Sequence, residues 1–171
     1  RCLIENGYDI NMKDGYGGNA LEWAAQENRI SNAKMLIEGG CDVNNLNGDG
    51  MTALYTACAE GNADMARLLL DNNAEPDRTE DATPLIIASC YGKIECVKLL
   101  LEHGADLNTI DNEGRTALFY AVVYRQDEVE KLLSDNGASY DICDKDGVSP
   151  GQLKDESVRE RVYSELMGEE K

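Results

Sequence analysis

Side chains that carry oxygen recur at alternate positions in the segment NNLNGDGMTALY, residues 44–55, and a glycine follows them. This is how the ligand loop of a helix–loop–helix calcium site begins, with Asn45 as the first oxygen donor here. Such a loop needs a bidentate Glu at its twelfth position, and that position is Thr56. Two similar segments place Tyr120 and Leu153 there. None of the three segments closes an oxygen cage, so the sequence predicts no calcium site.

Thiol and imidazole groups are the other candidates for chemistry, and they are scattered along the chain. The single histidine is His103, and no two cysteines form a CxxC pair. The six cysteines are Cys2, Cys41, Cys58, Cys90, Cys96 and Cys143. A structural zinc site needs four thiolate or imidazole ligands at close spacing, and an enzyme needs a nucleophile, a base and an orienting group in one pocket. The sequence therefore predicts no metal, no cofactor and no enzyme activity.

Several cysteines lie in apolar helical patterns, where a free thiol behaves as a small hydrophobic group. Reduced thiols of this kind suit a reducing compartment, so we expect a cytoplasmic protein, with the nucleus as an alternative. No apolar run is long enough for a membrane span, and no charged-then-apolar leader opens the chain. A repeated pattern is already under way at Arg1, so we expect the chain to be a fragment.

The chain is strongly acidic. It carries 33 acidic and 16 basic residues, which gives a formal net charge of −17. Such a charge repels nucleic acid and anionic lipid and attracts basic proteins. We therefore expect protein partners, basic ones among them, and no nucleic acid or membrane. The alternative interpretation is a solvated acidic surface that selects no partner.

The similar segments belong to an internal repeat. Residue types that cap helix N-termini return at steps of 33, 31, 33 and 33 residues, at Asn19, Thr52, Thr83, Thr116 and Ser149. A Gly or Asn follows each of the first four by 21 residues, at Gly40, Asn73, Gly104 and Gly137. Both types tolerate the left-handed backbone conformation that ends a helix. Each period therefore predicts a first helix that starts at the cap and a second that ends at the Gly or Asn.

Between these markers the composition indicates two helices that pack closely. Small residues such as Ala57 and Cys58 follow the cap, and Gly61 interrupts the helix soon afterwards. The second segment is amphipathic, with paired leucines such as Leu68 and Leu69 about one turn after an apolar residue. The polar segments between periods, of the NGDG type, have the composition of tight turns. The acidic residues that resemble calcium ligands are therefore interpreted as turn formers in a projecting hairpin.

The segments DNEGRTALFYAVVYRQDEVEKLLSDNGASYD and ATPLIIASCYGKIECVKLLLEHGADLN resemble ankyrin repeats. The period, the T-P/A-L start, the small pair, the paired leucines and the G-A-D-x-N ending agree over residues 1–153. The resemblance implies an all-α fold, an ankyrin-repeat solenoid of paired antiparallel helices with projecting β-hairpin turns. There are departures from the pattern. The usual His after T-P-L is absent, the hairpin between Asn73 and Thr83 is two residues short, and Arg125 replaces the inter-helix glycine in the fourth repeat.

The repeat pattern divides the chain into an array and a terminal helix. The array, residues 1–154, has a partial repeat, four full repeats and a degenerate fifth that starts near Asp144. The full repeats begin near Asp14, Asn47, Arg78 and Asp111. Residues 155–171 are expected to form a C-terminal capping helix and tail, because a solenoid must cover its last apolar face. We expect a capping box of Ser157 and Glu160 at the start of this helix.

The resemblance also implies where a partner binds. Ankyrin-repeat proteins hold their partners on a concave face made of hairpin tips and first helices. Carried over to this chain, the partner-binding positions are Tyr16, Gln26, Glu27, Asp49, Met51, Glu60, Glu80, Cys90, Tyr91, Glu113, Arg115, Val123 and Tyr124. They combine aromatic and apolar anchors with carboxylates, which suits a basic peptide or a basic protein surface.

These features predict a monomeric protein-interaction scaffold or adaptor. The alternative is an ankyrin targeting or regulatory region of a larger multidomain enzyme or channel. The resemblance further implies that Asn44 and Asn108, each eight residues after a leucine of the second helix, match sites of asparaginyl hydroxylation. That would be a modification of this chain and not an activity.

Other roles for the aromatic residues stay open. An alternative for Tyr91 and Tyr124 is packing between neighbouring repeats, since a buried tyrosine normally finds a partner for its hydroxyl group. The residues expected in the core between repeats are Trp23, Tyr55, Phe119 and Tyr120. A cage for methylated lysine is a further alternative, and its rings would be Tyr16, Trp23 and Tyr55 beside Glu27.

Overall fold

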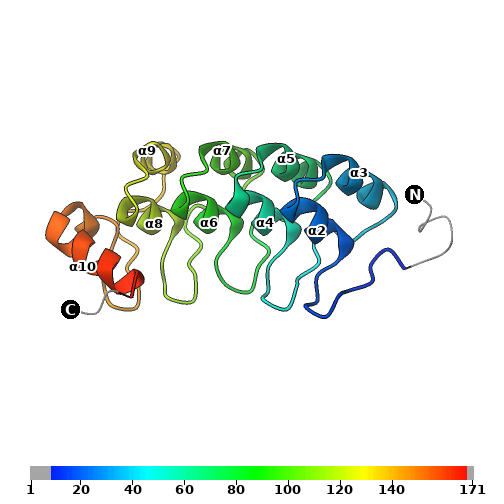
Figure 1. Ribbon diagram of the computed structural model, residues 1–171. Coiled ribbons are helices and arrows are strands. Elements are labelled where there is room, and N and C mark those ends of the chain that lie inside the picture. Colours follow the sequence, from blue (N-terminus) through cyan, green and yellow to red (C-terminus); the bar gives the residue numbers. More distant parts are fainter. Residues whose placement is uncertain (1–8, 169–171) are drawn as a thin grey trace.

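The computed structural model describes residues 9–168 of the chain, and within that range it contains helices and turns but no β-strand (Figure 1). The first eight residues of the expected partial repeat, which include Cys2, and the last three residues of the expected tail lie outside the described residues. The helices form a row of antiparallel pairs along the molecule (Figure 1). The all-α solenoid predicted from the repeat is confirmed.

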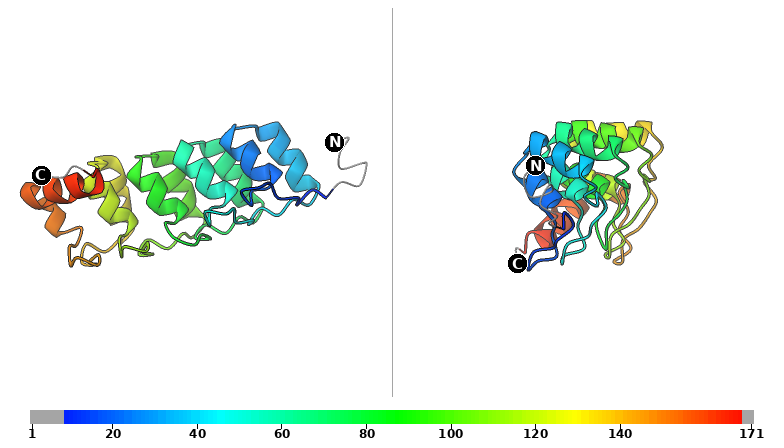
Figure 2. Two further views of the ribbon diagram at one scale, coloured as in Figure 1. Left: turned by 60° about the horizontal axis from the view of Figure 1, so that its bottom comes forward. Right: turned by 90° about the vertical axis from the view of Figure 1, so that its right-hand side faces the viewer.

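Each full repeat contributes a first, inner helix and a second, outer helix. The inner helices are α2 (Ala20–Gln26), α4 (Ala53–Glu60), α6 (Pro84–Cys90) and α8 (Ala117–Val123). The outer helices are α3 (Ile30–Glu38), α5 (Ala63–Asp71), α7 (Ile94–Glu102) and α9 (Asp127–Asp135). Inner helices pack against inner helices of the next repeat, and outer helices against outer helices. The result is two adjacent rows of helices, which Figure 2 shows from two further directions.

The inner helices begin at the predicted capping residues. Each cap side chain accepts hydrogen bonds from one or two backbone N–H groups of the first helical turn, and the caps are Asn19, Thr52, Thr83 and Thr116. The turns between paired helices also follow the prediction, because their central residues adopt left-handed backbone conformations. Gly61 has φ 77° between α4 and α5, and Arg125 has φ 55° between α8 and α9. The predicted markers behind the outer helices share this conformation, at Gly40, Asn73, Gly104 and Gly137.

The turns between repeats project from the inner helices on the side away from the outer helices (Figure 1). We call them fingers 1 to 5, at residues 14–18, 47–51, 78–82, 111–115 and 144–148. Finger 4 is closed by two backbone hydrogen bonds, from Asp111 N to Arg115 O at 3.0 Å and from Gly114 N to Asp111 O at 2.9 Å, and fingers 1, 2 and 5 have the equivalent bonds. The expected β-hairpin turns are therefore hydrogen-bonded turns without β-strands in the described residues.

The core lies between successive repeats. Its fully buried leucines recur at equivalent positions of the outer helices, at Leu69, Leu100 and Leu133. Phe119 is buried as predicted, while Tyr55 and Tyr120 are half-buried. The prediction of a core position for Trp23 is wrong, because its side chain is 52% exposed. The equivalent residue of a later repeat has a preceding helix pair beside it, whereas no described helix pair lies before α2.

A 3-10 helix, η1 (Gln152–Lys154), and a final helix, α10 (Glu156–Leu166), follow the fourth repeat. Helix α10 packs against η1 and α8 and buries Val162. The expected capping box is wrong: Asp155 is the N-cap, and its carboxylate accepts the Ser157 N–H at 2.9 Å. Asp155 takes this place because the chain leaves η1 there in an extended conformation. Within residues 9–168, no helix combines the length and apolar character that crossing a membrane requires.

Candidate functional site

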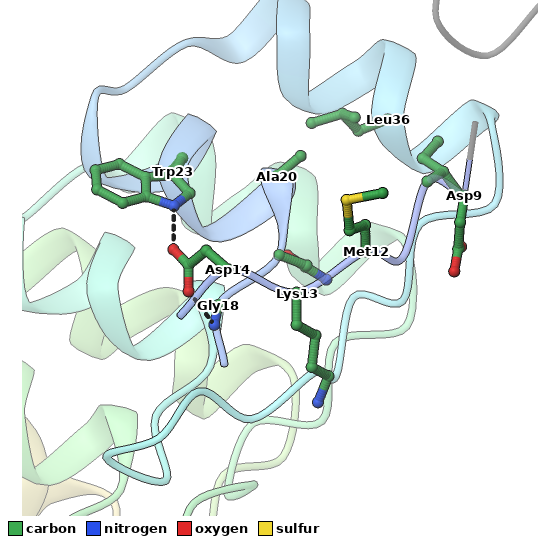
Figure 3. Close-up of a pocket in the computed structure, with 10 residues that line it drawn as sticks. Asp9, Met12, Lys13, Asp14, Gly18, Ala20, Trp23 and Leu36 are labelled. Atoms are coloured by element: carbon green, nitrogen blue, oxygen red, sulfur yellow. Dashed lines mark hydrogen bonds between the residues drawn. The ribbon is translucent and has the colours of Figure 1, made fainter. Parts of the chain in front are cut away.

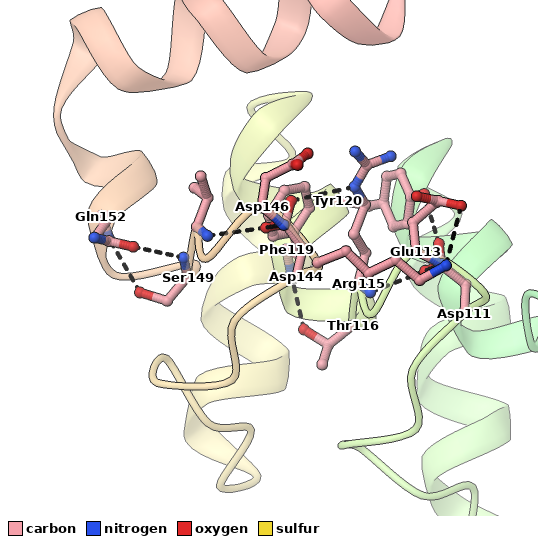
Figure 4. A network of polar contacts seen from close by, with 12 residues as sticks. Asp111, Glu113, Arg115, Thr116, Phe119, Tyr120, Asp144, Asp146, Ser149 and Gln152 are labelled. Atoms are coloured by element: carbon pink, nitrogen blue, oxygen red, sulfur yellow. Dashed lines mark hydrogen bonds and ion pairs between the residues drawn. The ribbon is translucent and has the colours of Figure 1, made fainter.

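The oxygen-bearing residues that resemble calcium ligands fold the fingers. In finger 4, Asp111 Oδ1 accepts the backbone N–H groups of Glu113 and Arg115, both at 2.9 Å (Figure 4). Pairs of bonds with the same spacing are accepted by Asp14, Asn47 and Asp144. The interpretation of these residues as turn formers is confirmed. Within the described residues, no three His, Cys, Asp or Glu side chains are grouped so that they could hold a metal ion.

Finger 3 is held differently, because the shortened segment before Thr83 lacks the Asp or Asn at its start. The Glu80 N–H donates to Gly50 O of finger 2 at 3.1 Å, and the Asp81 carboxylate accepts the Asn112 N–H of finger 4 at 2.7 Å. Fingers 1 and 2 are joined by the bond from Gly48 N to Tyr16 O at 2.6 Å. Neighbouring fingers therefore hold one another, and they form a continuous edge along the molecule.

Hydrogen bonds also join fingers to the helices behind them. The Trp23 indole N–H donates to Asp14 Oδ2 at 2.8 Å, and this bond is the main reason why the pKa of Asp14 is lowered (Figure 3). At the equivalent positions of the fourth repeat, the Tyr120 hydroxyl donates to Asp111 Oδ2 at 2.7 Å (Figure 4). Burial and this bond raise the pKa of Tyr120 well above its ordinary value. Although Trp23 is exposed, it therefore makes the same hydrogen bond to its finger as the half-buried Tyr120 does.

The asparagines that follow the outer helices have a similar structural role. Asn44 Oδ1 accepts the Glu75 N–H at 2.8 Å, and its amide group donates to Asn73 O at 3.1 Å. Asn108 Oδ1 accepts the Ser139 N–H at 3.1 Å. The hydrogen bonds of these two side chains link each of their repeats to the next one.

We define the inner face as the surface formed by the fingers and the C-terminal ends of the inner helices, where the concave face was expected. Exposed residues among the predicted partner positions are Tyr16, Gln26, Glu27, Asp49, Glu60, Glu80, Tyr91 and Glu113. Half-buried ones are Met51, Cys90, Arg115 and Tyr124. Tyr16 and Tyr91 are the open aromatic side chains of this set, at 82% and 57% exposed. The inner face therefore offers both apolar anchors and carboxylates to solvent.

Two of the predicted partner positions contact other parts of this chain instead of facing solvent. Val123 is 2% exposed, so its prediction as a partner contact is corrected: as the last residue of α8 its side chain belongs to the core. Arg115 is 15% exposed at its side chain and lies 3.5 Å from the buried Asp144 carboxylate of finger 5. Its guanidinium group also lies over the Phe119 ring, 5.5 Å from the centroid. Arg115 therefore joins fingers 4 and 5 and presents little surface.

The thiol of Cys90 lies on the inner face beside Tyr91. Burial raises its pKa to about 11, so the thiol is protonated near neutral pH and is a poor nucleophile. The cysteines of the described residues are all free thiols.

An aromatic cluster closes the C-terminal end of the inner face. Tyr124 stacks on Tyr120, with ring centroids 6.3 Å apart and planes at 10°, and it meets Tyr163 of α10 edge-on at 5.7 Å. The sequence did not single out Tyr163, which follows the buried Val162 in α10. Every ring pair in the described residues belongs to this half of the molecule, and none includes Tyr16, Trp23 or Tyr55. The rings of the alternative methyl-lysine cage are therefore not assembled.

Two open pockets lie at opposite ends of the array. One has a volume of about 340 Å³ and lies beside α2, with Met12, Ala20, Trp23 and Leu36 in its mostly apolar lining (Figure 3). The other has a volume of about 470 Å³ and lies between α10 and the turn after α8. Its lining includes Tyr124, Arg125, Arg159, Glu160 and Tyr163. It differs from the rest of the inner face because it contains two guanidinium groups.

Comparison with known proteins gives the family and one relative. The family described as "Ankyrin repeats (3 copies)" matches residues 1–80 and 75–146. A relative is "Ankyrin repeat and SOCS box protein 12" of Mus musculus, which is 53% identical over 34 residues. This match covers 20% of the present chain and 11% of the length of that protein.

Proposed function

Because this chain belongs to the ankyrin-repeat family, we propose that it is a scaffold or adaptor that holds a protein partner on its inner face and catalyses no reaction. Ankyrin repeats are generally protein–protein interaction modules. The observation that carries the choice of face is the combination of exposed aromatic anchors, Tyr16 and Tyr91, with carboxylates on one continuous surface. Exposed aromatic side chains of this kind become binding hot spots when a partner covers them.

The charge of the inner face supports a basic partner. Glu27 and Glu60 lie at the ends of inner helices, and Asp49 and Glu80 lie at the tips of fingers 2 and 3. All four are exposed, and they add to a chain whose net charge is −17. Charges arranged in this way attract a basic peptide or a basic protein surface, and they act mainly on the association rate.

We further propose that the array is a monomeric module in the cytoplasm, with the nucleus as an alternative. The proposed division is an array over residues 1–154 and a terminal helix with its tail over residues 155–171. A second candidate function is a targeting or regulatory array within a larger multidomain protein, such as an enzyme or a channel. It is supported by the relative, whose name contains a second module and of whose length the matched segment covers 11%.

A comparative pull-down from cytosolic extract tests the proposed surface. The bait is the chain itself, compared with a Tyr91→Ala, Glu60→Lys variant of the inner face. The matched control is Met35→Ala, which removes an exposed apolar side chain from the outer helix α3. We expect proteins that the parent and the control retain and that the inner-face variant loses. Partners held equally by all three baits would exclude the inner face as the binding surface.

A further inference from the structure

Equivalent positions of the four repeats change character along the inner face. The eighth residue after each cap lies at the C-terminal end of an inner helix, and in order these residues are Glu27, Glu60, Tyr91 and Tyr124. The ninth residue lies in the turn to the outer helix, and in order these residues are Asn28, Gly61, Gly92 and Arg125. The row is therefore acidic in repeats 1 and 2 and aromatic in repeats 3 and 4, and it ends in a guanidinium group.

The pocket at this end adds a second guanidinium group. Arg159 projects from α10, and its side chain is 16% exposed. Its two hydrogen bonds, to Leu153 O and to Glu156 Oε1, are both long at 3.4 Å, and its Nε is buried without a partner. Five N–H groups are available on a guanidinium, so Arg159 retains hydrogen-bonding capacity. Arg125 donates to the same carboxylate of Glu156 at 2.8 Å.

The ion pair between Arg125 and Glu156 can be exchanged. The side chains of Arg125 and Glu156 are 61% and 66% exposed, and pairs between exposed groups contribute little to stability. Both arginines donate to Glu156 Oε1, so an incoming carboxylate that takes the place of Glu156 can accept from both, beside Glu160 in the same pocket lining. The rings of Tyr124 and Tyr163 form the apolar part of the same pocket and suit the methylene groups of an acidic side chain.

We propose that the partner contributes an extended segment whose basic residues lie over repeats 1 and 2 and whose Asp or Glu side chain enters the pocket of Arg125 and Arg159. This inference rests on the proposed function and deepens it by giving the partner a charge order. A partner that is basic throughout would meet like charge at this end. The charge order also fixes the direction in which the segment lies along the array.

The geometry of the fold sets the spacing between the two kinds of charge. Packed helices lie about 10 Å apart, so Glu60 in repeat 2 and Arg125 in repeat 4 are separated by about 20 Å along the row. An extended peptide advances about 3.3 Å per residue. The basic and acidic residues of the segment should therefore be about six positions apart.

Selection from a phage library of random 16-residue peptides tests the proposal. The targets are the parent chain, Arg125→Gly and Glu60→Gln. Glycine suits the left-handed conformation of position 125, where φ is 55°, so the variant loses the guanidinium group without backbone strain. The parent should select peptides with a basic residue and an acidic residue about six positions apart. Arg125→Gly should lose the acidic preference alone, and Glu60→Gln should weaken the basic preference alone.

Binding measurements on one selected peptide complete the test. Replacing its acidic residue by Gln should weaken binding to the parent about five- to tenfold and should leave binding to Arg125→Gly unchanged. Equal losses in the two proteins, or selected peptides without an acidic preference, would overturn the inference and leave the proposed function standing. Selection of no peptide by the parent would also overturn the inference alone, because the pull-down decides separately whether the inner face binds proteins.

Discussion

At the scale of single residues, the carboxylate of Asp111 shows how the fold uses its acidic side chains. It is nearly buried at 9% exposed, and it accepts two backbone N–H groups and the Tyr120 hydroxyl. A buried carboxylate with three donors is a stabilising element of the finger. The net charge of this chain therefore combines two populations, the structural acids inside the fingers and the exposed acids on the surface.

Replacing Asp111 by Ala should lower the free energy of unfolding by about 2–3 kcal/mol, because three partly buried hydrogen bonds to a charged acceptor are lost. Urea unfolding followed by circular dichroism measures this change. The control is Asp49→Ala, an exposed position at the tip of finger 2, which should change stability by less than about 0.5 kcal/mol. Equal effects at the two positions would contradict a structural role for Asp111.

Glu22 gives a prediction about pH. Burial raises the pKa of its carboxyl group, the nearby Asp14 and Asp49 raise it further, and the hydrogen bond from Asn47 opposes them. Because the folded state prefers the protonated group, the charged form of Glu22 costs stability as the pH rises above the ordinary pKa of 4.5. Glu22→Gln should therefore be more stable than the parent near pH 7, and this advantage should disappear near pH 3.

Thermal unfolding at a series of pH values measures the advantage. Glu27→Gln removes one charge from an exposed position of the same helix pair and serves as the control. An advantage of Glu22→Gln that persists unchanged at low pH would show that shape, and not ionisation, determines the effect.

At the scale of elements, the turn between α8 and α9 contains a residue type that its backbone conformation disfavours. Arg125 occupies a left-handed conformation that glycine adopts in repeats 2 and 3. A side chain in this conformation costs about 1–2 kcal/mol. The strained residue is the one whose guanidinium group lines the C-terminal pocket. Such a local exception in an otherwise regular repeat marks a position that selection for stability alone does not explain.

The Arg125→Gly variant should unfold at a higher urea concentration than the parent, because its free energy of unfolding should be about 0.5–1 kcal/mol larger. The gain is smaller than the full conformational cost because the exposed ion pair with Glu156 is lost. Glu156→Gln isolates the contribution of that pair and should change stability by less than about 1 kcal/mol. A destabilised Arg125→Gly would mean that the arginine has a structural function that outweighs its backbone strain.

At the scale of the whole molecule, the repeats are stable only together. Each helix pair contacts its neighbours, and the fingers are joined across repeats by hydrogen bonds. An array of this kind presents one long surface along its stacked repeats. Long-range charge and local anchors should then affect binding kinetics differently, because steering acts before contact and aromatic burial acts after it.

Charge reversal at Glu60 and Glu80 should slow association with a captured partner about three- to tenfold at low salt, and the difference should shrink at high salt. Tyr91→Ala should instead speed dissociation about tenfold. Surface plasmon resonance separates the two rates. The matched control reverses Glu102 and Asp135, exposed residues at the C-terminal ends of outer helices, and leaves the net charge equal to that of the inner-face variant. Equal slowing by both pairs would show that net charge alone steers association.

The regular parts of the fold could be predicted because they depend on contacts within a few residues. Thr52 caps the helix that follows it directly, and Gly61 ends that helix through its own backbone conformation. The candidate site was less predictable. Val123 and Tyr124 are neighbours in the chain, yet one is buried and the other is half-buried beside α10. Which of two adjacent residues faces the core depends on helices from other parts of the chain.

The sequence by itself determined the period of the repeat, the positions of the caps and left-handed residues, and the acidic charge, since these follow from residue type and spacing. Only the tertiary structure decided which aromatic side chains are exposed and which arginines share a pocket. Trp23 and Tyr120 hold the same place in their repeats, and they differ in exposure because their neighbours along the stack differ. Arg125 and Arg159 are far apart in sequence and share one pocket because α10 turns back onto α8.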